Sequence, residues 1–455
     1  MYLALGAALI LVLAWAVPPC QAAEADELVT NPQFLTSEDR PLPAGWSVWE
    51  PEWAGAACVV RLVPGGLRME APGKPHAVGG VTQELTGVSG GRAYAVHADC
   101  ELVGVPFPYR SALVRLEWTQ GGKALHPAGT LVRGPLIDGD RARFDDTFVA
   151  PTEADGARLS LETKWLQGGS VTWSRVSLQP SEPPKPRKVK VGTVYLRPQN
   201  STPERNLALW CAQIDSAGTL GLDIVCLGEA IRMVGTGASL ADCSEPIPGP
   251  ATRQLGEAAR RNHLWVVAGL NECAGDTSYN TAVLLNREGE LAGTYRKVHL
   301  PREEWRKGIT PGSEYPVFST DFGTLAVQIC YDWFFSEPAA IFAQQGAEIL
   351  FAPTWGNTLP DHDGMIDGES TFRVRARDNG LYLVPSVYDG NSLVIDPRGR
   401  LLASSNGKEG VVWAEIDLSV REPLEWVGHW RSIGPRDRMP ETYGPLLGMP
   451  GARPH

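Results

Sequence analysis

A carboxylate, an ammonium and a thiol each lie at the C-terminal end of a predicted buried strand in the second half of the chain. They belong to Glu229, Lys297 and Cys330, which are 68 and 33 residues apart. In one pocket these groups would form a working nucleophile, because the Lys charge favours thiolate over thiol. The carboxylate would take and return a proton, and the Lys would stabilise an oxyanion. The set therefore predicts covalent catalysis by the cysteine.

Each of the three residues also has an ordinary structural explanation. A Cys after an apolar strand is usually a small buried hydrophobic residue. A Glu before a loop is often a helix cap or solvated, and a Lys on a hairpin is usually at the surface. What favours a function is their shared position at the ends of predicted strands, where α/β folds build their sites.

The elements that must position these residues alternate between strands and helices from Lys188 onward. Such alternation predicts an α/β layered fold. Strands are predicted at 189–196, 222–227, 264–269, 281–286, 325–329, 348–352, 381–386 and 392–395. Helices are predicted over 203–218 and 250–262, the first with an apolar face made of Leu207, Trp210, Cys211 and Ile214.

Residues 24–180 have the pattern of an all-β domain. Short apolar or alternating stretches occur at 93–96, 113–118, 157–162 and 171–173, with Gly, Pro and Asp between them. This spacing is typical of a sandwich. Trp46, Trp49 and Trp53 are candidates for stacking on a sugar ring, although a Trp in such a domain more often packs in the core.

A proline-rich segment separates the two regions. Ser181 to Pro186 contains three prolines in six residues, which disfavours helix and sheet and makes a semi-rigid spacer. We therefore predict a linker over 181–187. It joins a domain over 24–180 to a second domain over 188–455, which ends in a C-terminal tail.

The first 23 residues carry no charged side chain and have the pattern of a secretory signal peptide. An apolar run from Tyr2 to Val17 is followed by two prolines and by Cys20-Gln21-Ala22-Ala23. We predict cleavage after Ala22 or Ala23 and export to the periplasm or the exterior. No basic residue precedes the apolar run, which leaves an uncleaved membrane anchor as the alternative.

Composition excludes some partners. A formal charge of −11 over 455 residues, without a dense Lys/Arg run, argues against a nucleic-acid partner, which needs a concentrated basic surface. Eight cysteines, of which Cys20 falls in the signal peptide, leave an odd number in an oxidising compartment, so at least one thiol stays unpaired. A disulfide between Cys58 and Cys100 is left open by the sequence.

Residues 188–420 resemble the nitrilase superfamily, also called the carbon–nitrogen hydrolases. That family's Glu–Lys–Cys order matches Glu229, Lys297 and Cys330. The surrounding motifs are similar to the family's Lys, Cys and late helix motifs, and they read Arg296-Lys297-Val298-His299-Leu300-Pro301, Cys330-Tyr331-Asp332-Trp333-Phe334-Phe335-Ser336-Glu337 and Arg375-Ala376-Arg377-Asp378-Asn379. The N-terminal region resembles jelly-roll modules similar to carbohydrate-binding domains, through Asn31-Pro32-Gln33-Phe34, Pro43-Ala44-Gly45-Trp46, Phe148-Val149-Ala150-Pro151 and Gly169-Ser170-Val171-Thr172-Trp173.

The resemblance implies a four-layer αββα core that forms homodimers, and a mechanism without metal or cofactor. Glu229 would deprotonate Cys330, and Lys297 with the backbone N–H of Tyr331 would bind the oxyanion. The family's second Glu, which orients the Lys, maps to Glu303 or Glu304, with Glu304 favoured. Amide, ureido or nitrile compounds are the implied substrates, and the Cys330 context is closer to amidases and N-carbamoyl hydrolases than to true nitrilases. The N-terminal module would be expected to bind carbohydrate.

Two departures from the family pattern concern the helix behind the nucleophile. Ser336 replaces a Pro, and Ala340 stands where the family has an Arg. They keep open the alternative of an exported binding protein with impaired catalysis, and an acyltransferase with the same triad is the second alternative. A papain-like pair of Cys330 and His429 lacks the local signature, and Asp361-His362-Asp363 has the pattern of a polar loop instead of a metal site.

Overall fold

The computed structural model describes residues 26–35, 42–71, 73–74, 76–356, 368–424 and 426–447. The predicted signal peptide over 1–23, Cys20 and the polar loop Asp361-His362-Asp363 lie outside the described residues. The chain divides into two compact units, one of residues 1–123 and 134–183, the other of residues 124–133 and 184–455. The division at 183/184 falls inside the predicted linker. Residues 124–133, which the sequence placed in the first domain, group with the second.

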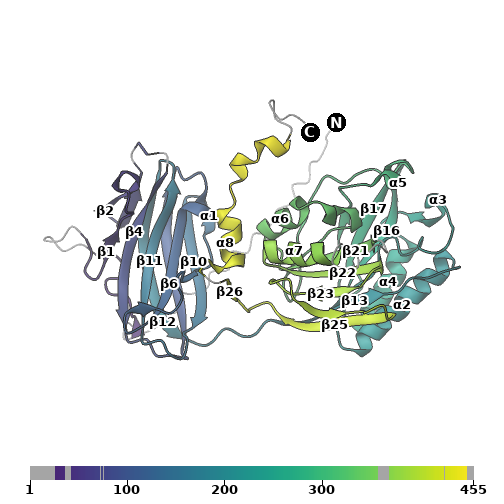
Figure 1. The fold of residues 1–455 in the computed structure, drawn as a ribbon, viewed down its shortest axis with the longest axis horizontal. Coiled ribbons are helices and arrows are strands. Elements are labelled where there is room, and N and C mark those ends of the chain that lie inside the picture. Colours follow the sequence, from purple (N-terminus) through teal and green to yellow (C-terminus); the bar gives the residue numbers. More distant parts are fainter. Residues whose placement is uncertain are drawn as a thin grey trace, which may run out of the picture. The chain divides into compact units, whose positions relative to one another are not determined.

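The first unit consists of antiparallel strands in two sheets (Figure 1). Its short helical turns are η2 (Ala54–Ala56) and α1 (Pro108–Ser111). One sheet has the order β1 (Ser47–Trp49), β4 (Ala77–Thr86), β11 (Gly156–Leu166), β6 (Ala112–Gln120) and β7 (Lys123–Ala124). The other has the order β2 (Val59–Val63), β3 (Gly66–Glu70), β12 (Ser170–Ser181), β5 (Ala93–Val103), β10 (Arg141–Val149) and β9 (Leu136–Asp138).

The two sheets share a core. Tyr94 of β5 and Trp118 of β6, one from each sheet, have ring centroids 5.7 Å apart. Trp46 is buried against Phe34 at 5.4 Å, so it belongs to the core and cannot stack on a ligand. Trp49 and Trp53 are exposed. Cys58 and Cys100 are each free, so the disulfide considered from the sequence is not formed.

The second unit has two large sheets of mixed direction and a two-stranded sheet of β26 (Pro423–Leu424) and β27 (Gly428–His429). The first has the order β18 (Leu291–Arg296), β17 (Thr277–Leu285), β16 (Trp265–Ala274), β14 (Ile224–Cys226), β13 (Lys188–Tyr195) and β25 (Gly410–Asp417), and β15 (Ser244–Glu245) pairs with β16. The second has the order β19 (Phe318–Ser319), β20 (Thr324–Val327), β21 (Ile349–Gly356), β22 (Tyr382–Asp389), β23 (Leu393–Ile395) and β24 (Leu401–Ser404). β13, β14 and β16 are parallel, as are β20, β21 and β22.

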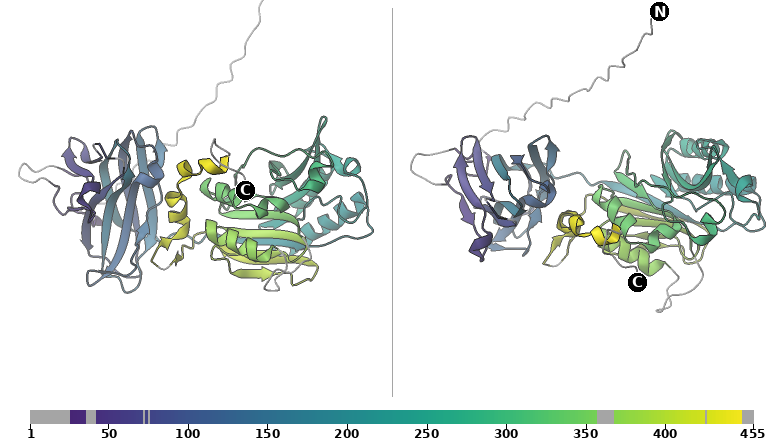
Figure 2. Two further views of the ribbon diagram at one scale, coloured as in Figure 1. Left: turned by 45° about the horizontal axis from the view of Figure 1, so that its top comes forward. Right: turned by 90° about the horizontal axis from the view of Figure 1, so that it is seen from above.

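Helices cover the outer face of each sheet (Figures 1 and 2). α2 (Pro203–Thr219) and α4 (Pro250–Asn262) cover the first sheet, and α6 (Glu337–Gln344) and α7 (Glu369–Asn379) cover the second. The predicted α/β fold is confirmed. The remaining elements of this unit are β8 (Thr130–Leu131), α3 (Leu240–Cys243), α5 (Arg302–Trp305), η3 (Cys330–Phe334), α8 (Trp430–Asp437), η4 (Pro440–Thr442) and η5 (Gly444–Leu447).

Alternate side chains of β14 point to opposite faces of its sheet and pack in two different cores. Ile224 and Cys226 face the other sheet, in a core that includes Val327 and Phe351, whereas Val225 faces the helices and packs in the core of Trp210. A strand that is buried on both faces must be apolar throughout, which is why 224–227 is a continuous apolar run. Among the described helices, none is long and apolar enough to cross a membrane.

Candidate active site

The ends of three strands bring the reactive residues predicted from the sequence to one place. Glu229 follows β14, Lys297 directly follows β18, and Cys330 follows β20 as the first residue of η3. β14 and β20 lie in different sheets, and the segment after the carboxyl end of each carries a reactive residue that is held by the sheet yet faces a loop region. Glu229 pairs with Lys297, and the charges of both act on the Cys330 thiol.

Lys297 is buried between two carboxylates. Its Nζ lies 2.8 Å from Oε1 of Glu229 and 2.9 Å from Oε2 of Glu304, and only 1% of the lysine is exposed. Burial alone would lower the pKa of Lys297, but the charges of Glu229, Cys330 and Glu304 outweigh it and raise the pKa above its usual value. The lysine is therefore a permanent cation. Of the two candidates for the family's second Glu, Glu303 and Glu304, it is Glu304 that pairs with Lys297.

Cys330 lies in a strained turn beside Glu229. Its φ is +41°, a left-handed conformation that non-glycine residues rarely adopt. Removal of the sulfur from water raises the pKa of Cys330 to about 12, and the charge of Glu229 acts in the same direction. Lys297 and the backbone N–H of Trp355 oppose this rise. The resting nucleophile is thus a thiol, and Tyr331 follows it in η3.

Glu229 is fixed on both carboxylate oxygens. Oε1 accepts hydrogen bonds from Lys297 and from Nδ2 of Asn280, each at 2.8 Å, and Oε2 accepts one from the backbone N–H of Trp355 at 2.9 Å. Its backbone carbonyl accepts a hydrogen bond from the Tyr388 hydroxyl at 2.6 Å. A Cβ on Gly228 would lie 2.3 Å from that hydroxyl oxygen, so the turn before Glu229 requires glycine.

Asn280 is a site residue that the sequence analysis missed. It lies in β17 with 2% exposed, and its Nδ2 donates to Glu229 Oε1 and to Glu304 Oε1, at 2.8 and 2.7 Å. The prediction began this strand at Thr281, four residues after its actual start, and so left Asn280 outside it. A polar residue continuing an apolar strand was the signal that could have revealed it.

Asp332 links the turn of Cys330 to the segment after Lys297. Its fully buried carboxylate accepts hydrogen bonds from the Tyr295 hydroxyl and the Ile329 N–H on Oδ2, at 2.7 and 2.9 Å. His299 donates to Oδ1. The ring of His299 also stacks on Phe335 at 4.2 Å. This network sets the relative position of the thiol and the ammonium.

The two departures from the family pattern lie on the helix behind the nucleophile. Ser336 immediately precedes α6 and is exposed, and Ala340 lies within α6 and is half-buried. Neither position contributes to the hydrogen bonds that hold Glu229, Lys297 and Glu304.

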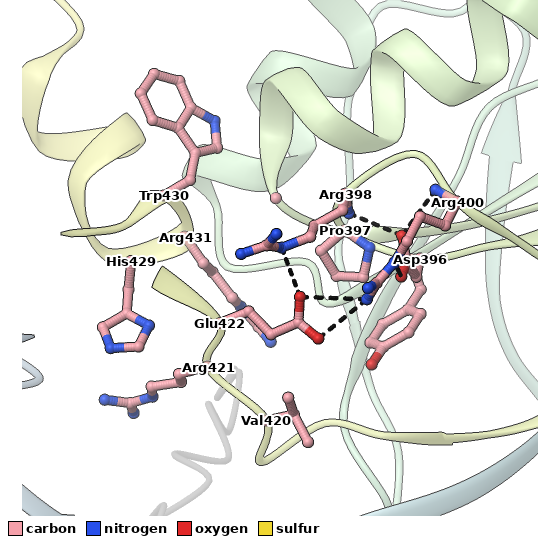
Figure 3. A pocket seen from close by; sticks show the side chains of 12 residues that line it. Asp396, Pro397, Arg398, Arg400, Val420, Arg421, Glu422, His429, Trp430 and Arg431 are labelled. Atoms are coloured by element: carbon pink, nitrogen blue, oxygen red, sulfur yellow. Dashed lines mark hydrogen bonds and ion pairs between the residues drawn. The ribbon is translucent and has the colours of Figure 1, made fainter. Parts of the chain in front are cut away.

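A cavity of about 70 Å³ lies away from the candidate active site (Figure 3). It is near Tyr382, the first residue of β22, whereas Tyr388 at the other end of that strand contacts Glu229. Ion pairs fill most of its wall. Arg398 and Arg400 both pair with Glu422, at 2.5 and 3.0 Å, and Arg400 also pairs with Asp396 at 2.5 Å. The arrangement joins the β23–β24 turn to the C-terminal segment, so we interpret the cavity as part of a structural clamp.

Comparison with known proteins relates this site to one family. Residues 190–425 match the family model described as carbon-nitrogen hydrolase. The omega-amidase NIT2 of Homo sapiens is 32% identical over 235 residues, which cover 47% of this chain and 83% of that protein. A probable nitrilase of Schizosaccharomyces pombe is 34% identical over 213 residues, or 44% of this chain and 75% of that protein. The crystal structure of an amidase from Nesterenkonia sp. superposes with a TM-score of 0.47 at 22% identity, over 57% of this chain and 96% of the amidase.

Proposed function

The chain belongs to the carbon–nitrogen hydrolase family, whose members act on non-peptide bonds, and from this premise we propose that it is a thiol amidohydrolase for small amides or N-carbamoyl compounds. Glu229, Lys297 and Cys330 are the proposed catalytic residues. The observation that carries the proposal is the buried Lys297 ammonium, which lies between Glu229 and Glu304 and acts electrostatically on the Cys330 thiol. The names of the omega-amidase relatives favour amides.

In the acylation step, Cys330 attacks the carbonyl carbon of the amide. Its S–H proton passes to Glu229 as the S–C bond forms, and the carbonyl π electrons move to oxygen. Lys297 and the backbone N–H of Tyr331 stabilise that oxyanion, an effect worth about 3–4 kcal/mol for one such donor. When the C=O bond reforms, the C–N bond breaks and nitrogen takes the proton back from Glu229, releasing ammonia or an amine.

In the deacylation step, water hydrolyses the thioester. Glu229 takes a proton from the water as its oxygen bonds to the carbonyl carbon. The resulting oxyanion again faces Lys297, and its collapse breaks the C–S bond. The sulfur recovers its proton from Glu229, so the enzyme returns to the thiol state in which it began.

The test measures ammonia release across a panel of amides, ureido acids and nitriles. Cys330→Ala should lower turnover by several orders of magnitude without unfolding the protein, because it removes the covalent nucleophile. Intact mass under turnover should show an acyl adduct on the wild-type chain and none on the variant. A folded Cys330→Ala protein with near-normal turnover would refute the assignment.

We propose further that the first unit is a jelly-roll module that binds carbohydrate. Its strand orders, β3-β12-β5-β10 in one sheet and β4-β11-β6 in the other, support the jelly roll. The exposed Trp49 and Trp53, at 48% and 79%, support an aromatic platform. Co-sedimentation with insoluble polysaccharides should fall in Trp53→Ala and stay unchanged in Leu35→Ala, a matched exposed apolar residue.

We also propose that the protein is exported and acts as a homodimer. The uncharged apolar run at residues 1–23 supports export. Mass spectrometry of the N-terminus of the protein recovered from the periplasm or medium would identify the cleavage site, and recovery only with membranes would indicate an anchor. The family resemblance supports the dimer, and light scattering of the purified protein would measure its mass.

A further inference from the structure

Asn280 closes a ring of three hydrogen bonds and one ion pair that joins Glu229, Glu304 and Lys297. Its Nδ2 joins Glu229 Oε1 to Glu304 Oε1, and Lys297 Nζ joins Glu229 Oε1 to Glu304 Oε2. The backbone carbonyl of Asn280 also accepts a hydrogen bond from the Lys297 N–H at 2.9 Å. One side chain thus contacts both carboxylates and the strand end that carries the ammonium.

The orientation of the Asn280 amide is determined by its partners. Both amide protons point at carboxylate oxygens, and Oδ1 is buried with no hydrogen-bond partner among the described residues. A flipped amide would place Oδ1 against the oxygens of Glu229 and Glu304, where it would meet two negative charges. Only a neutral double donor satisfies this position.

The two oxygens of Glu229 consequently differ in what they can still accept. A carboxylate oxygen has two in-plane lone pairs. On Oε1 these are filled by Lys297 and Asn280, whereas Oε2 accepts only the N–H of Trp355. The charge of Glu229 acts on the Cys330 thiol, and Oε2 is the carboxylate oxygen with a lone pair left to accept the thiol proton.

We infer that Asn280 is a positioning residue that, together with Lys297, saturates Oε1 of Glu229 so that Oε2 alone exchanges protons with the sulfur, the leaving nitrogen and the water. The inference rests on the proposed function, because it assigns an atom to each proton transfer of that mechanism. It also explains why a buried amide, and not a carboxylate or an apolar residue, lies between two glutamates.

Two substitutions separate this role from simple packing. Asn280→Asp keeps the size of the side chain but removes both donors and adds a third carboxylate, whereas Asn280→Ala removes donors and volume. If Asn280 only fills space, Asp preserves activity and Ala impairs it. If it donates, Ala lowers kcat about 10- to 100-fold with little change in KM, and Asp lowers it at least as much.

The pH dependence provides a second readout. Asn280 stabilises the charged form of the carboxylate pair, so its removal should move the acidic limb of the kcat profile upward by about one pH unit in Asn280→Ala and further in Asn280→Asp. Asn280→Ser, which retains one donor, should lie between wild type and Asn280→Ala. Asn379→Ala removes another buried amide, at the end of α7, and should leave the limb unchanged.

The rate of Cys330 alkylation by iodoacetamide, followed by mass spectrometry as a function of pH, tests the same acidic pH dependence without a substrate. If the wild type releases no ammonia from any panel compound, the proposed function fails while this measurement still tests Asn280. If thermal denaturation shows that Asn280→Asp and Asn280→Ala are unfolded, the pH dependence of Asn280→Ser decides the question instead. Wild-type rates in Asn280→Asp, or an unmoved acidic limb in every folded variant, would overturn the inference.

Discussion

Asp332 Oδ1 accepts hydrogen bonds from both the backbone N–H and the ring Nδ1 of His299, each at 2.9 Å. The same carboxylate holds the Ile329 N–H through its other oxygen. Two loops from different strands are therefore fastened to one buried anion, and the Cys330 turn cannot move independently of the segment that follows Lys297.

We expect Asp332→Asn to separate these loops. In the wild type, the Tyr295 hydroxyl and the Ile329 N–H both donate to Oδ2 of Asp332. An amide NH2 group at that position cannot accept these hydrogen bonds, so it leaves buried donors unpaired at a cost of about 1–3 kcal/mol each. Thermal stability and kcat should both fall. Glu337→Gln, at an exposed carboxylate of α6, serves as the control. Unchanged kcat in a folded Asp332→Asn protein would show that the fastening does not matter for catalysis.

Glu229→Gln should make the Cys330 thiol more acidic while abolishing turnover. In the wild type, burial and the Glu229 charge raise the pKa of Cys330 to about 12. Removing that charge leaves Lys297 as the nearest ion, so the pKa should fall. The thiolate ultraviolet absorbance, taken as the difference from the matching Cys330→Ala protein, should appear at lower pH in Glu229→Gln. Appearance at higher pH would contradict the assigned electrostatics.

Glu348 is predicted to make stability depend on acid pH. Burial would raise its pKa, but hydrogen bonds from Arg187 and the charge of Arg431 lower the pKa below its usual value of 4.5. A lowered folded-state pKa stabilises the protein above the unfolded value, and this stabilisation is lost as pH falls through the folded value. Glu348→Gln should therefore lower the free energy of unfolding by about 1.5–3 kcal/mol at neutral pH.

Denaturant titration of Glu348→Gln and wild type at several pH values measures this difference. The two curves should converge as the pH falls below about 4, because the wild-type carboxylate then becomes neutral. A constant difference across the acid range would show that the loss comes from packing and not from charge.

A truncated chain beginning at Arg187 is predicted to remain soluble and to keep Cys330 reactive toward iodoacetamide. It lacks residues 124–133, which group with the second unit. A Cβ on Gly428 would lie 3.4 Å from Ala128, so β27 loses a neighbour in the truncated chain. Hydrogen exchange should accelerate there and not in β14 or β20. Aggregation of the truncated chain alone would mean that the N-terminal region supports the core of the hydrolase fold.

The sequence predicted which residues lie together better than the contacts that hold them in place. Glu229, Lys297 and Cys330 could be found because each lies at a strand end within a short motif. Asn280 could not, because its value comes from two partners that are 51 and 24 residues away and meet it only after folding. Its strand was also predicted to start too late.

Contacts between distant segments explain the other differences. The sequence contained no sign that Ala128 would lie beside Gly428, 300 residues later, and the structure groups segment 124–133 with the second unit, whereas the sequence placed it in the first domain. Trp46 and Trp53 looked equivalent as aromatic residues near turns, and only the packing of Phe34 against Trp46 distinguishes the buried one from the exposed one. Helix bounds were easier, because α4 is delimited locally by Pro250 and His263.

The positive φ of Cys330 means that this residue lowers the stability of the folded protein. A left-handed non-glycine residue destabilises a protein by about 1 kcal/mol relative to glycine, which adopts that conformation freely. Cys330→Gly should thus release local tension, and a protein without its reactive group would withstand heat better than the native chain. Selection for stability alone would favour glycine at this position, so the retained thiol supports the catalytic role proposed for Cys330.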